Sequence, residues 1–281
     1  MNAIEVRGLK KSYGDFVLGP VDLTLPQGSI MGLVGENGAG KSTLIKLIMN
    51  AVPRDGGTVQ VLGTDNRSRE FWALKADVGV VLDEAYYPEV LSARSVGRMM
   101  GLTYPNWDGE AYNGFLDRFR LPRDKELKAF SRGMKMKLAI AAALSHRPRL
   151  LLLDEATSGL DPIIRDEILD VFNEFTRDET HSVLLSSHIV SDLEKICDYI
   201  AFLHQGRLLL CEEKDRLVES YAILKLSGEE LQAVPPEAVI GKKEGRYGVE
   251  ALVRRDGVSA AFRAERAGLE DIILFLARGE K

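Results

Sequence analysis

The stretch that most constrains the fold of this chain is GENGAGKST, which runs from Gly35 to Thr43. It follows an apolar segment and precedes one with helical periodicity, so it predicts a strand ending at Val34, a glycine-rich turn and a helix from about Lys41 to Met49. The pattern G-x-x-x-x-G-K-[ST] turns backbone N–H groups inward around a phosphate, and the positive end of the helix dipole faces the same point. We therefore expect a nucleotide-phosphate site here.

The residue types in this motif suit contact with a polyphosphate. Glycines let the main chain approach the anion, and the Lys41 ammonium can reach the β- and γ-phosphates. The hydroxyl of Ser42 can ligate Mg²⁺. We expect nucleotide contacts along the whole motif, from Gly35, Asn37, Gly38, Ala39, Gly40, Lys41, Ser42 and Thr43.

A second chemical element is the pair of carboxylates that ends the apolar run LLLLDE. Asp154 closes a buried strand and can hold Mg²⁺ through water from across the site. Glu155 follows it directly and can polarise a water molecule for attack on the γ-phosphate. We therefore predict that Asp154 is a metal ligand and that Glu155 is a catalytic residue.

The order of strand-like and helix-like segments predicts an α/β fold. Short apolar runs such as DVGVVL and RLLLLD alternate with helical patterns such as PIIRDEILDVFNEFTR, which is typical of a largely parallel sheet. The sequence pattern of residues 84–149 is typical of a helical insert. The residues after about 220 have the pattern of a small α+β extension. We expect two units, residues 1–219 and 220–281.

Composition disfavours several classes of protein. The net charge is -5, with Lys and Arg mixed among Asp and Glu, which argues against a surface devoted to nucleic acid. Cys197 and Cys211 lack metal-ligand spacing, so we expect two reduced thiols. No signal-peptide core opens the chain, and no window approaches the roughly 20 apolar residues of a membrane helix. If the protein works at a membrane, we expect another chain to cross it.

These motifs, in this order, resemble the ATP-binding cassette (ABC) family over residues 2–217. The resemblance implies a P-loop NTPase core with an N-terminal antiparallel β element, a helical insert, and ATP with Mg²⁺ as cofactors. It implies that Tyr13 stacks on adenine and that SGLDP, which contains Asp161, lies near the nucleotide at the interface of two cassettes. His188 matches the histidine that contacts the γ-phosphate, and it is expected to act with Glu155 and Lys41 in catalysis.

The stretch FSRGMKMKL, residues 130–138, stands where the family has its signature motif, at a helix N-terminus. The resemblance implies that two cassettes pack head to tail and that Ser131 and Gly133 of each contact the ATP of the other. Arg132 departs from the common pattern and adds a positive charge near an anion. We therefore expect an altered signature that still handles phosphate, in trans.

A further departure lies in VGVVLDEAYY. The family glutamine that touches Mg²⁺ or water, and that couples to the membrane partner, aligns with Asp83. An aspartate is shorter and charged, so metal contact is expected while the coupling geometry is altered. Glu84 is the alternative to Asp83 at this position.

Four features point to one branch of the family: Asp83, YPNWD at Tyr104 to Asp108, SRGMKMKLAIAAALSH and the closing amphipathic GLEDIILFLARGE. Together they resemble bacterial export-type ATPase subunits whose permease is a separate polypeptide, of the phenol-soluble-modulin and acetoin- or bacitracin-associated kind. This implies a cytoplasmic protein held at the inner face of the cell membrane through the permease. The second cassette could be another copy or a different chain, and no nucleic-acid partner is expected. Four aromatic residues could line the permease seat or pack the insert: Tyr86, Tyr87, Tyr104 and Trp107.

The main alternative is a soluble cassette ATPase that acts on ribosomes or DNA. Such proteins usually carry two cassettes in one chain or a long coiled-coil insert, and this sequence has neither. A module that holds ATP without turnover is a third hypothesis, which the presence of both Glu155 and His188 disfavours. The sequence does not identify the transported molecule, because specificity would reside in the permease.

Overall fold

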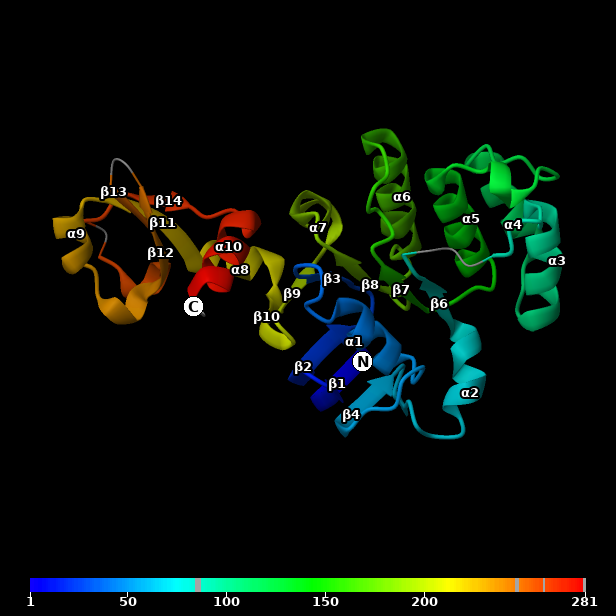
Figure 1. Ribbon diagram of the computed structural model, residues 1–281, viewed down its shortest axis with the longest axis horizontal. Coiled ribbons are helices and arrows are strands. Elements are labelled where there is room, and N and C mark those ends of the chain that lie inside the picture. The colour runs from blue at the N-terminus through cyan, green and yellow to red at the C-terminus, as the bar shows by residue number, and fades with distance from the viewer. Residues whose placement is uncertain (84–86, 246–247, 260, 280–281) are drawn as a thin grey trace.

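The computed structural model describes residues 1–83, 87–245, 248–259 and 261–279. Its centre is a six-stranded sheet in the order β10-β9-β3-β8-β7-β6 (Figure 1). Neighbouring strands run parallel except for β10, which pairs antiparallel with β9. The predicted parallel α/β core is confirmed. The strands are β3 (Ile30–Val34), β6 (Val78–Val81), β7 (Leu150–Asp154), β8 (Ser182–Ser187), β9 (Tyr199–His204) and β10 (Arg207–Glu213).

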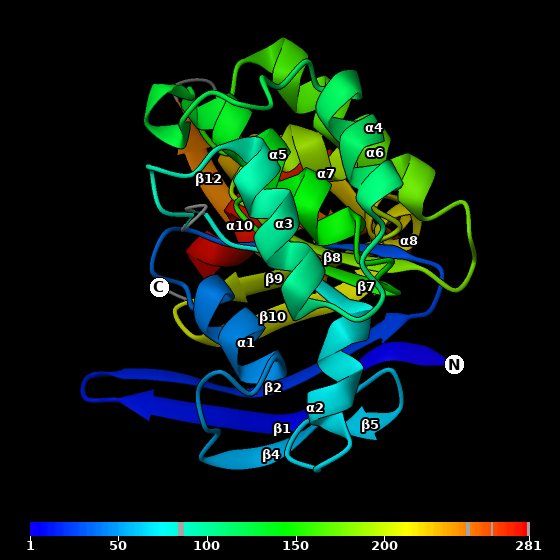
Figure 2. The same ribbon diagram turned by 90° about the vertical axis from the view of Figure 1, so that its right-hand side faces the viewer.

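A second sheet, antiparallel and in the order β2-β1-β4-β5, lies below the first (Figure 2). Helix α1 (Lys41–Ile48) runs between the two sheets, and Leu44 and Ile48 are buried in one apolar cluster with strands of both. The strand-turn-helix order predicted around the glycine-rich motif is therefore present. The strands are β1 (Asn2–Tyr13), β2 (Phe16–Pro26), β4 (Gly56–Val61) and β5 (Thr64–Asp65).

The helical insert lies between β6 and β7. Its three helices begin at Ser92, Asp108 and Ser131, whose side chains each accept a hydrogen bond from a backbone N–H in the first helical turn. Helices α5, α6 and α7 lie on one side of the central sheet and α1 on the other (Figure 1). The helices between β5 and β9 are α2 (Phe71–Leu74), α3 (Ala93–Thr103), α4 (Gly109–Arg118), α5 (Arg132–Leu144), α6 (Pro162–Phe175) and α7 (Val190–Ile196), with short 3-10 helices at Lys75–Asp77 and Leu127–Ala129.

A third sheet, antiparallel and in the order β12-β13-β11-β14, forms the C-terminal part. Helix α8 (Lys214–Ser220) leads into it, so one helix spans the point where we expected the two units to meet. The other elements are β11 (Tyr221–Leu226), α9 (Gly228–Gln232), β12 (Val239–Gly245), β13 (Gly248–Arg254), β14 (Ala264–Arg266) and α10 (Leu269–Gly279), with 3-10 helices at Pro236–Ala238 and Arg255–Gly257.

Helix α10 joins this C-terminal part to the central core. Leu269 and Ile272 are fully buried in the same apolar cluster as α5, α6 and α7. The backbone N–H of Leu269 donates to Glu194 Oε1 on α7 at 3.0 Å. The amphipathic pattern of α10 is therefore explained by packing against β12 and against α7, which is the helix that follows His188.

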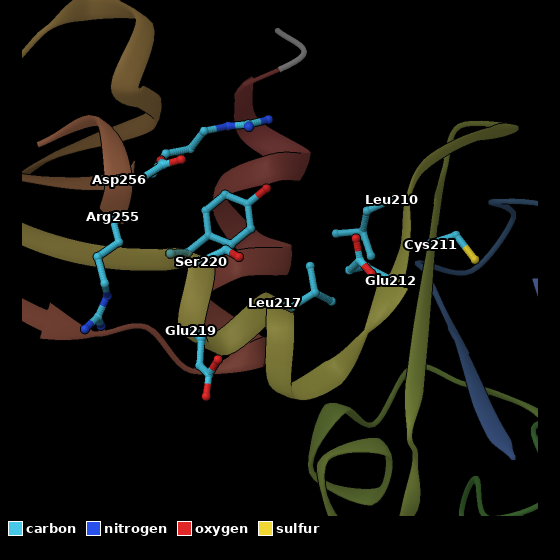
Figure 3. Close-up of a pocket in the computed structure, with 10 residues that line it drawn as sticks. Leu210, Cys211, Glu212, Leu217, Glu219, Ser220, Arg255 and Asp256 are labelled. Carbon is cyan, nitrogen blue, oxygen red and sulfur yellow. The ribbon is translucent and has the colours of Figure 1, made fainter.

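A cavity of about 600 Å³ lies at the junction of the two parts (Figure 3). Cys211 and Glu212 of β10 line one side, and Ser220, Arg255 and Asp256 line the other. Both cysteines are free thiols, and burial raises the pKa of Cys197 and of Cys211. Among the residues that the structure describes, no helix has the length and apolar character needed to cross a bilayer.

Candidate active site

The glycine-rich turn and the start of α1 line a cavity of about 320 Å³ beyond the carboxyl end of β3. In open α/β sheets ligands bind beyond the carboxyl ends of the strands. Gly38 has a φ of 86° and Gly40 one of 108°, which lets the turn close in front of the helix. The lining residues are Phe16, Glu36, Asn37, Gly38, Gly40, Lys41, Ser42, Thr43, Asp83 and Glu155.

Two other residues of the motif support the turn from behind. Ala39 is buried in the cluster around α1. Gly35 touches β9 so closely that a Cβ atom there would lie 2.3 Å from the carbonyl oxygen of Leu203. The shape of the turn therefore depends on contact with a strand that is distant in the sequence.

Lys41 places a buried ammonium at the floor of the cavity. Its side chain is 6% exposed, and Nζ donates to the carbonyl oxygens of Gly35 at 2.7 Å and Glu36 at 3.3 Å. The same Nζ lies 3.0 Å from Glu155 Oε1. A buried cation in the first turn of a helix, where the dipole end is positive, favours a polyanionic ligand.

Glu155 joins this lysine to His188. Oε2 of Glu155 lies 2.7 Å from His188 Nδ1, and an ionised carboxylate can only accept, so Nδ1–H donates. Glu155 has a φ of 51°, and its backbone N–H donates at 3.1 Å to both the carbonyl oxygen and the Oγ of Ser186. Strained backbone of this kind clusters at functional sites. The predicted catalytic residues Lys41, Glu155 and His188 are thus one connected group.

Asp154 lies just behind the cavity. It is 3% exposed, and its Oδ1 accepts a hydrogen bond of 2.6 Å from Ser186 Oγ. Oε1 of Glu155 is buried, and no residue that the structure describes forms a hydrogen bond with it. Its 3.0 Å approach to Lys41 is therefore an ion pair without hydrogen-bond geometry. Within the described residues no group of three or more His, Cys, Asp or Glu side chains could hold a metal alone. Mg²⁺ usually keeps waters and substrate phosphates as ligands, so a hydroxyl and a carboxylate fit it without such a group.

The predicted signature residues stand outside this cavity. Ser131 is exposed and caps α5 by accepting from the N–H of Met134 at 3.3 Å. Gly133 is buried, and a Cβ atom there would lie 2.9 Å from Cδ1 of Ile164. Asp161 caps α6 through a 3.1 Å bond from the N–H of Ile164. None of the three lines the pocket of its own chain, which fits the prediction that they act on another cassette.

Tyr13 ends β1, and Phe16 faces it across the β1–β2 turn. Tyr13 is 44% exposed with the Lys11 ammonium 5.3 Å from its ring centre, and adenine stacking stays a prediction. Phe16 was missed by the sequence reasoning, yet it lines both the phosphate cavity and a neighbouring one of about 530 Å³. Gln205 and Arg207 line that second cavity and had no signal in the sequence.

Asp83 lines the cavity and pairs with Arg132, Oδ1 to Nη2, at 2.9 Å. Two of the residues that depart from the family pattern, Asp83 and Arg132, therefore contact each other within one chain. Glu84, the alternative at this position, lies outside the described residues.

The described aromatic residues of the insert pack against their surroundings. Tyr104 stacks on His146 with 4.1 Å between ring centres, and Trp107 lies 5.1 Å from Tyr112. Tyr87 packs on the core, and burial raises its pKa to about 12. Tyr86 lies outside the described residues. Of the two hypotheses for these side chains, packing of the insert is the one the structure supports.

Comparison with known proteins agrees with this geometry. A family model described as ABC transporter matches residues 18–158. The chain is 33% identical over 220 residues to the lantibiotic transport ATP-binding protein SrtF of Streptococcus pyogenes, covering 75% of this chain and 91% of that one. It is 34% identical over 210 residues to the bacitracin transport ATP-binding protein BcrA of Enterococcus faecalis, covering 73% and 68%.

Solved structures show the same fold. An ATP-binding subunit of an ABC transporter matches with a TM-score of 0.69 and 27% identity, covering 76% of this chain and 91% of that one. A bacterial ABC transporter cassette solved as a dimer matches with a TM-score of 0.68 and 21% identity, covering 75% and 98%. The same cassette has also been solved bound to ADP and phosphate, with a TM-score of 0.67, 20% identity and coverage of 75% and 98%. The chain described here therefore belongs to the ABC transporter family, as an ATP-binding protein and an ATPase.

Proposed function

We propose that this chain is the ATP-hydrolysing subunit of an ABC exporter, in which two cassettes pack head to tail around two Mg-ATP and drive a separate permease. The observation that carries the proposal is the split site. Lys41 and Glu155 line one cavity and His188 bonds to Glu155, whereas neither Ser131 nor Gly133 of the same chain lines that cavity. A second cassette would complete the site by presenting its own α5 N-terminus to the γ-phosphate.

In this proposal each residue has one task. The backbone of the turn and Lys41 hold the β- and γ-phosphates. Glu155 accepts a proton from the attacking water as the new bond to the γ-phosphorus forms and the bond to the ADP oxygen breaks. His188 donates to Glu155 and keeps its carboxylate directed at that water. ADP and inorganic phosphate are the products.

Three residues would hold Mg²⁺: Ser42 through its hydroxyl, Asp154 through water and Asp83 at the cavity wall. The ion would supply positive charge that neutralises the phosphates. Ser42 is exposed to the cavity, while Asp154 is oriented by Ser186.

The permease is the proposed membrane partner, and it would hold the cassette at the cytoplasmic face. Two relatives are named for transport of a lantibiotic and of bacitracin. Two large apolar side chains are exposed on the elements α3 and α2: Leu102 is 92% exposed and Trp72 is 74% exposed. Asn106 bonds Ala76 at 3.3 Å, so the insert and the core meet at this corner. We propose this corner as the permease seat, in place of the packed aromatic residues.

We also propose that residues 1–219 act as the cassette and that residues 220–281 form an appended unit. Support comes from the separate antiparallel sheet that begins at Tyr221. The buried side of α10 fixes this unit against α7.

The test is solution mass by light scattering for Glu155→Gln with and without Mg-ATP. Loss of hydrolysis should trap an ATP-bound dimer, and the added Ser131→Arg change should abolish it. A monomer under all conditions would contradict the head-to-tail homodimer. For the permease, tagged protein drawn from native membranes should bring down a polytopic chain, and a Trp72→Ser/Leu102→Ser variant should lose it. If no polytopic chain is recovered with the unmodified protein, the transporter assignment fails.

A further inference from the structure

The ion pair between Asp83 and Arg132 joins two parts of the chain that are 49 residues apart. Asp83 follows β6 and lines the phosphate cavity beside Lys41 and Glu155. Arg132 is the first residue of α5, directly after the Ser131 cap. The pair therefore connects the signature helix to the nucleotide cavity of the same chain.

Arg132 also contacts the loop that follows β7. A Cβ atom added at Gly159 would lie 2.8 Å from Nη1 of Arg132, so the guanidinium packs on the main chain of the SGLDP segment. Gly159 has a φ of 68°, which disfavours any side chain there. One guanidinium thus bridges the loops that carry Asp83 and Asp161.

The charges around the cavity explain why such a bridge is needed. Three carboxylates, those of Glu36, Asp83 and Glu155, line the cavity that would receive a polyphosphate, and Asp154 lies just behind it. Glu36 Oε1 lies 3.3 Å from His204 Nδ1. Glu155 is compensated by Lys41, and Asp154 accepts from Ser186. Arg132 is the basic group that pairs with Asp83. Without it, the Asp83 carboxylate would face an anionic ligand uncompensated.

We propose that Arg132 acts on the nucleotide site of its own chain, as the positioning and charge-balancing partner of Asp83. This inference rests on the proposed ATP site. It differs from the expectation that Arg132 serves the phosphate of a second cassette. It also makes these two departures from the family pattern one functional unit.

The expected effect is small, because the two side chains are 55% and 53% exposed. Exposed ion pairs contribute little to stability, so removal of this one should leave folding intact. If loss of the ion pair weakens ligand binding by as much as an exposed ion pair contributes to stability, the Kd rises about 3- to 5-fold. The contact must therefore be detected as a change in the Kd for nucleotide, and the melting temperature shows whether the variant is still folded.

The test measures the Kd of a fluorescent ATP analogue, MANT-ATP, in EDTA, at protein concentrations where light scattering finds monomers. In monomers a contact between two cassettes cannot affect the Kd. In EDTA no Mg²⁺ is available to neutralise the Asp83 carboxylate. Arg132→Gln should weaken binding about 3- to 5-fold, while Asp83→Asn/Arg132→Gln should bind as Asp83→Asn does. Lys135→Gln is the matched control, because Lys135 lies one turn along α5 and pairs with Glu89 at 2.8 Å.

The outcomes distinguish failure of the proposed ATP site from failure of the proposed role of Arg132. If unmodified protein does not bind MANT-ATP, the proposed ATP site itself fails. If it binds and Arg132→Gln has no effect in monomers, or the same effect with and without Asp83→Asn, the same-chain role of Arg132 is overturned. A melting temperature lowered in Arg132→Gln but not in Lys135→Gln would also overturn it, because the contact would then be structural.

Discussion

Replacing Gly35 by alanine should destabilise the protein more than the same change at Gly38. At Gly35 the new Cβ would lie 2.3 Å from the carbonyl oxygen of Leu203 and 3.2 Å from Cβ of Ala39, so main chain has to move. At Gly38 no atom of the described residues lies within 4 Å of the new Cβ, and the cost is that of the left-handed φ of 86°.

The two costs can be compared in magnitude. Overpacking against a backbone that cannot yield costs about 3 kcal/mol, at the upper end of the usual range. A left-handed alanine costs about 1 kcal/mol. For a unit of this size each kcal/mol shifts the melting temperature by about 2–4 °C, so Gly35→Ala should melt about 4–8 °C below Gly38→Ala.

Thermal unfolding followed by circular dichroism, with and without Mg-ATP, would measure the difference. Gly38→Ala should keep an ATP-dependent rise in melting temperature, because β3 and α1 stay in place. Gly35→Ala should lose most of it, because the turn is displaced from β9. Equal melting temperatures, or a lower one for Gly38→Ala, would refute the argument that contact with Leu203 shapes the turn.

Three further changes test other parts of the structure. Glu155→Gln should lower kcat by about 10²- to 10⁴-fold with a smaller change in KM for ATP, measured by phosphate release; an unchanged kcat would exclude Glu155 as the base. Burial lowers the pKa of His146, so as pH falls below about 6.5 the unfolded chain binds a proton that the folded chain does not, and stability falls. His146→Gln should lose this acid-dependent part of the melting temperature. Ile272→Ala should cost about 2–5 kcal/mol in urea unfolding and Leu274→Ala, half exposed on the same helix, less than about 0.5; equal costs would mean that α10 is not held on α7.

The elements that local sequence determines were predicted well. The turn between β3 and α1 depends on glycines and on the start of the next helix, and both lie within one short continuous stretch of sequence. The buried strands β6 and β7 were visible as unbroken apolar runs. For the same reason Lys41, Asp154 and Glu155 could be proposed as site residues, since each stands at a fixed distance from the end of a strand or turn.

The positions of residues from distant segments depend on the tertiary structure. Phe16 and Arg207 line one cavity because β2 and β10 approach each other. Neither segment contains a sequence motif from which this contact could be predicted. The bridge from Arg132 to Asp83 is likewise absent from any local pattern.

The amphipathic sequence of α10 indicates that one face is buried but not what covers it. Burial of an apolar face is favourable against any complementary surface, because the hydrophobic effect has no direction. Only the assembled core, with α7 and β12 in place, selects where Leu269 and Ile272 pack. Local chemistry therefore determined the nucleotide motif and the helix, whereas long-range packing decided which charges and which surfaces meet.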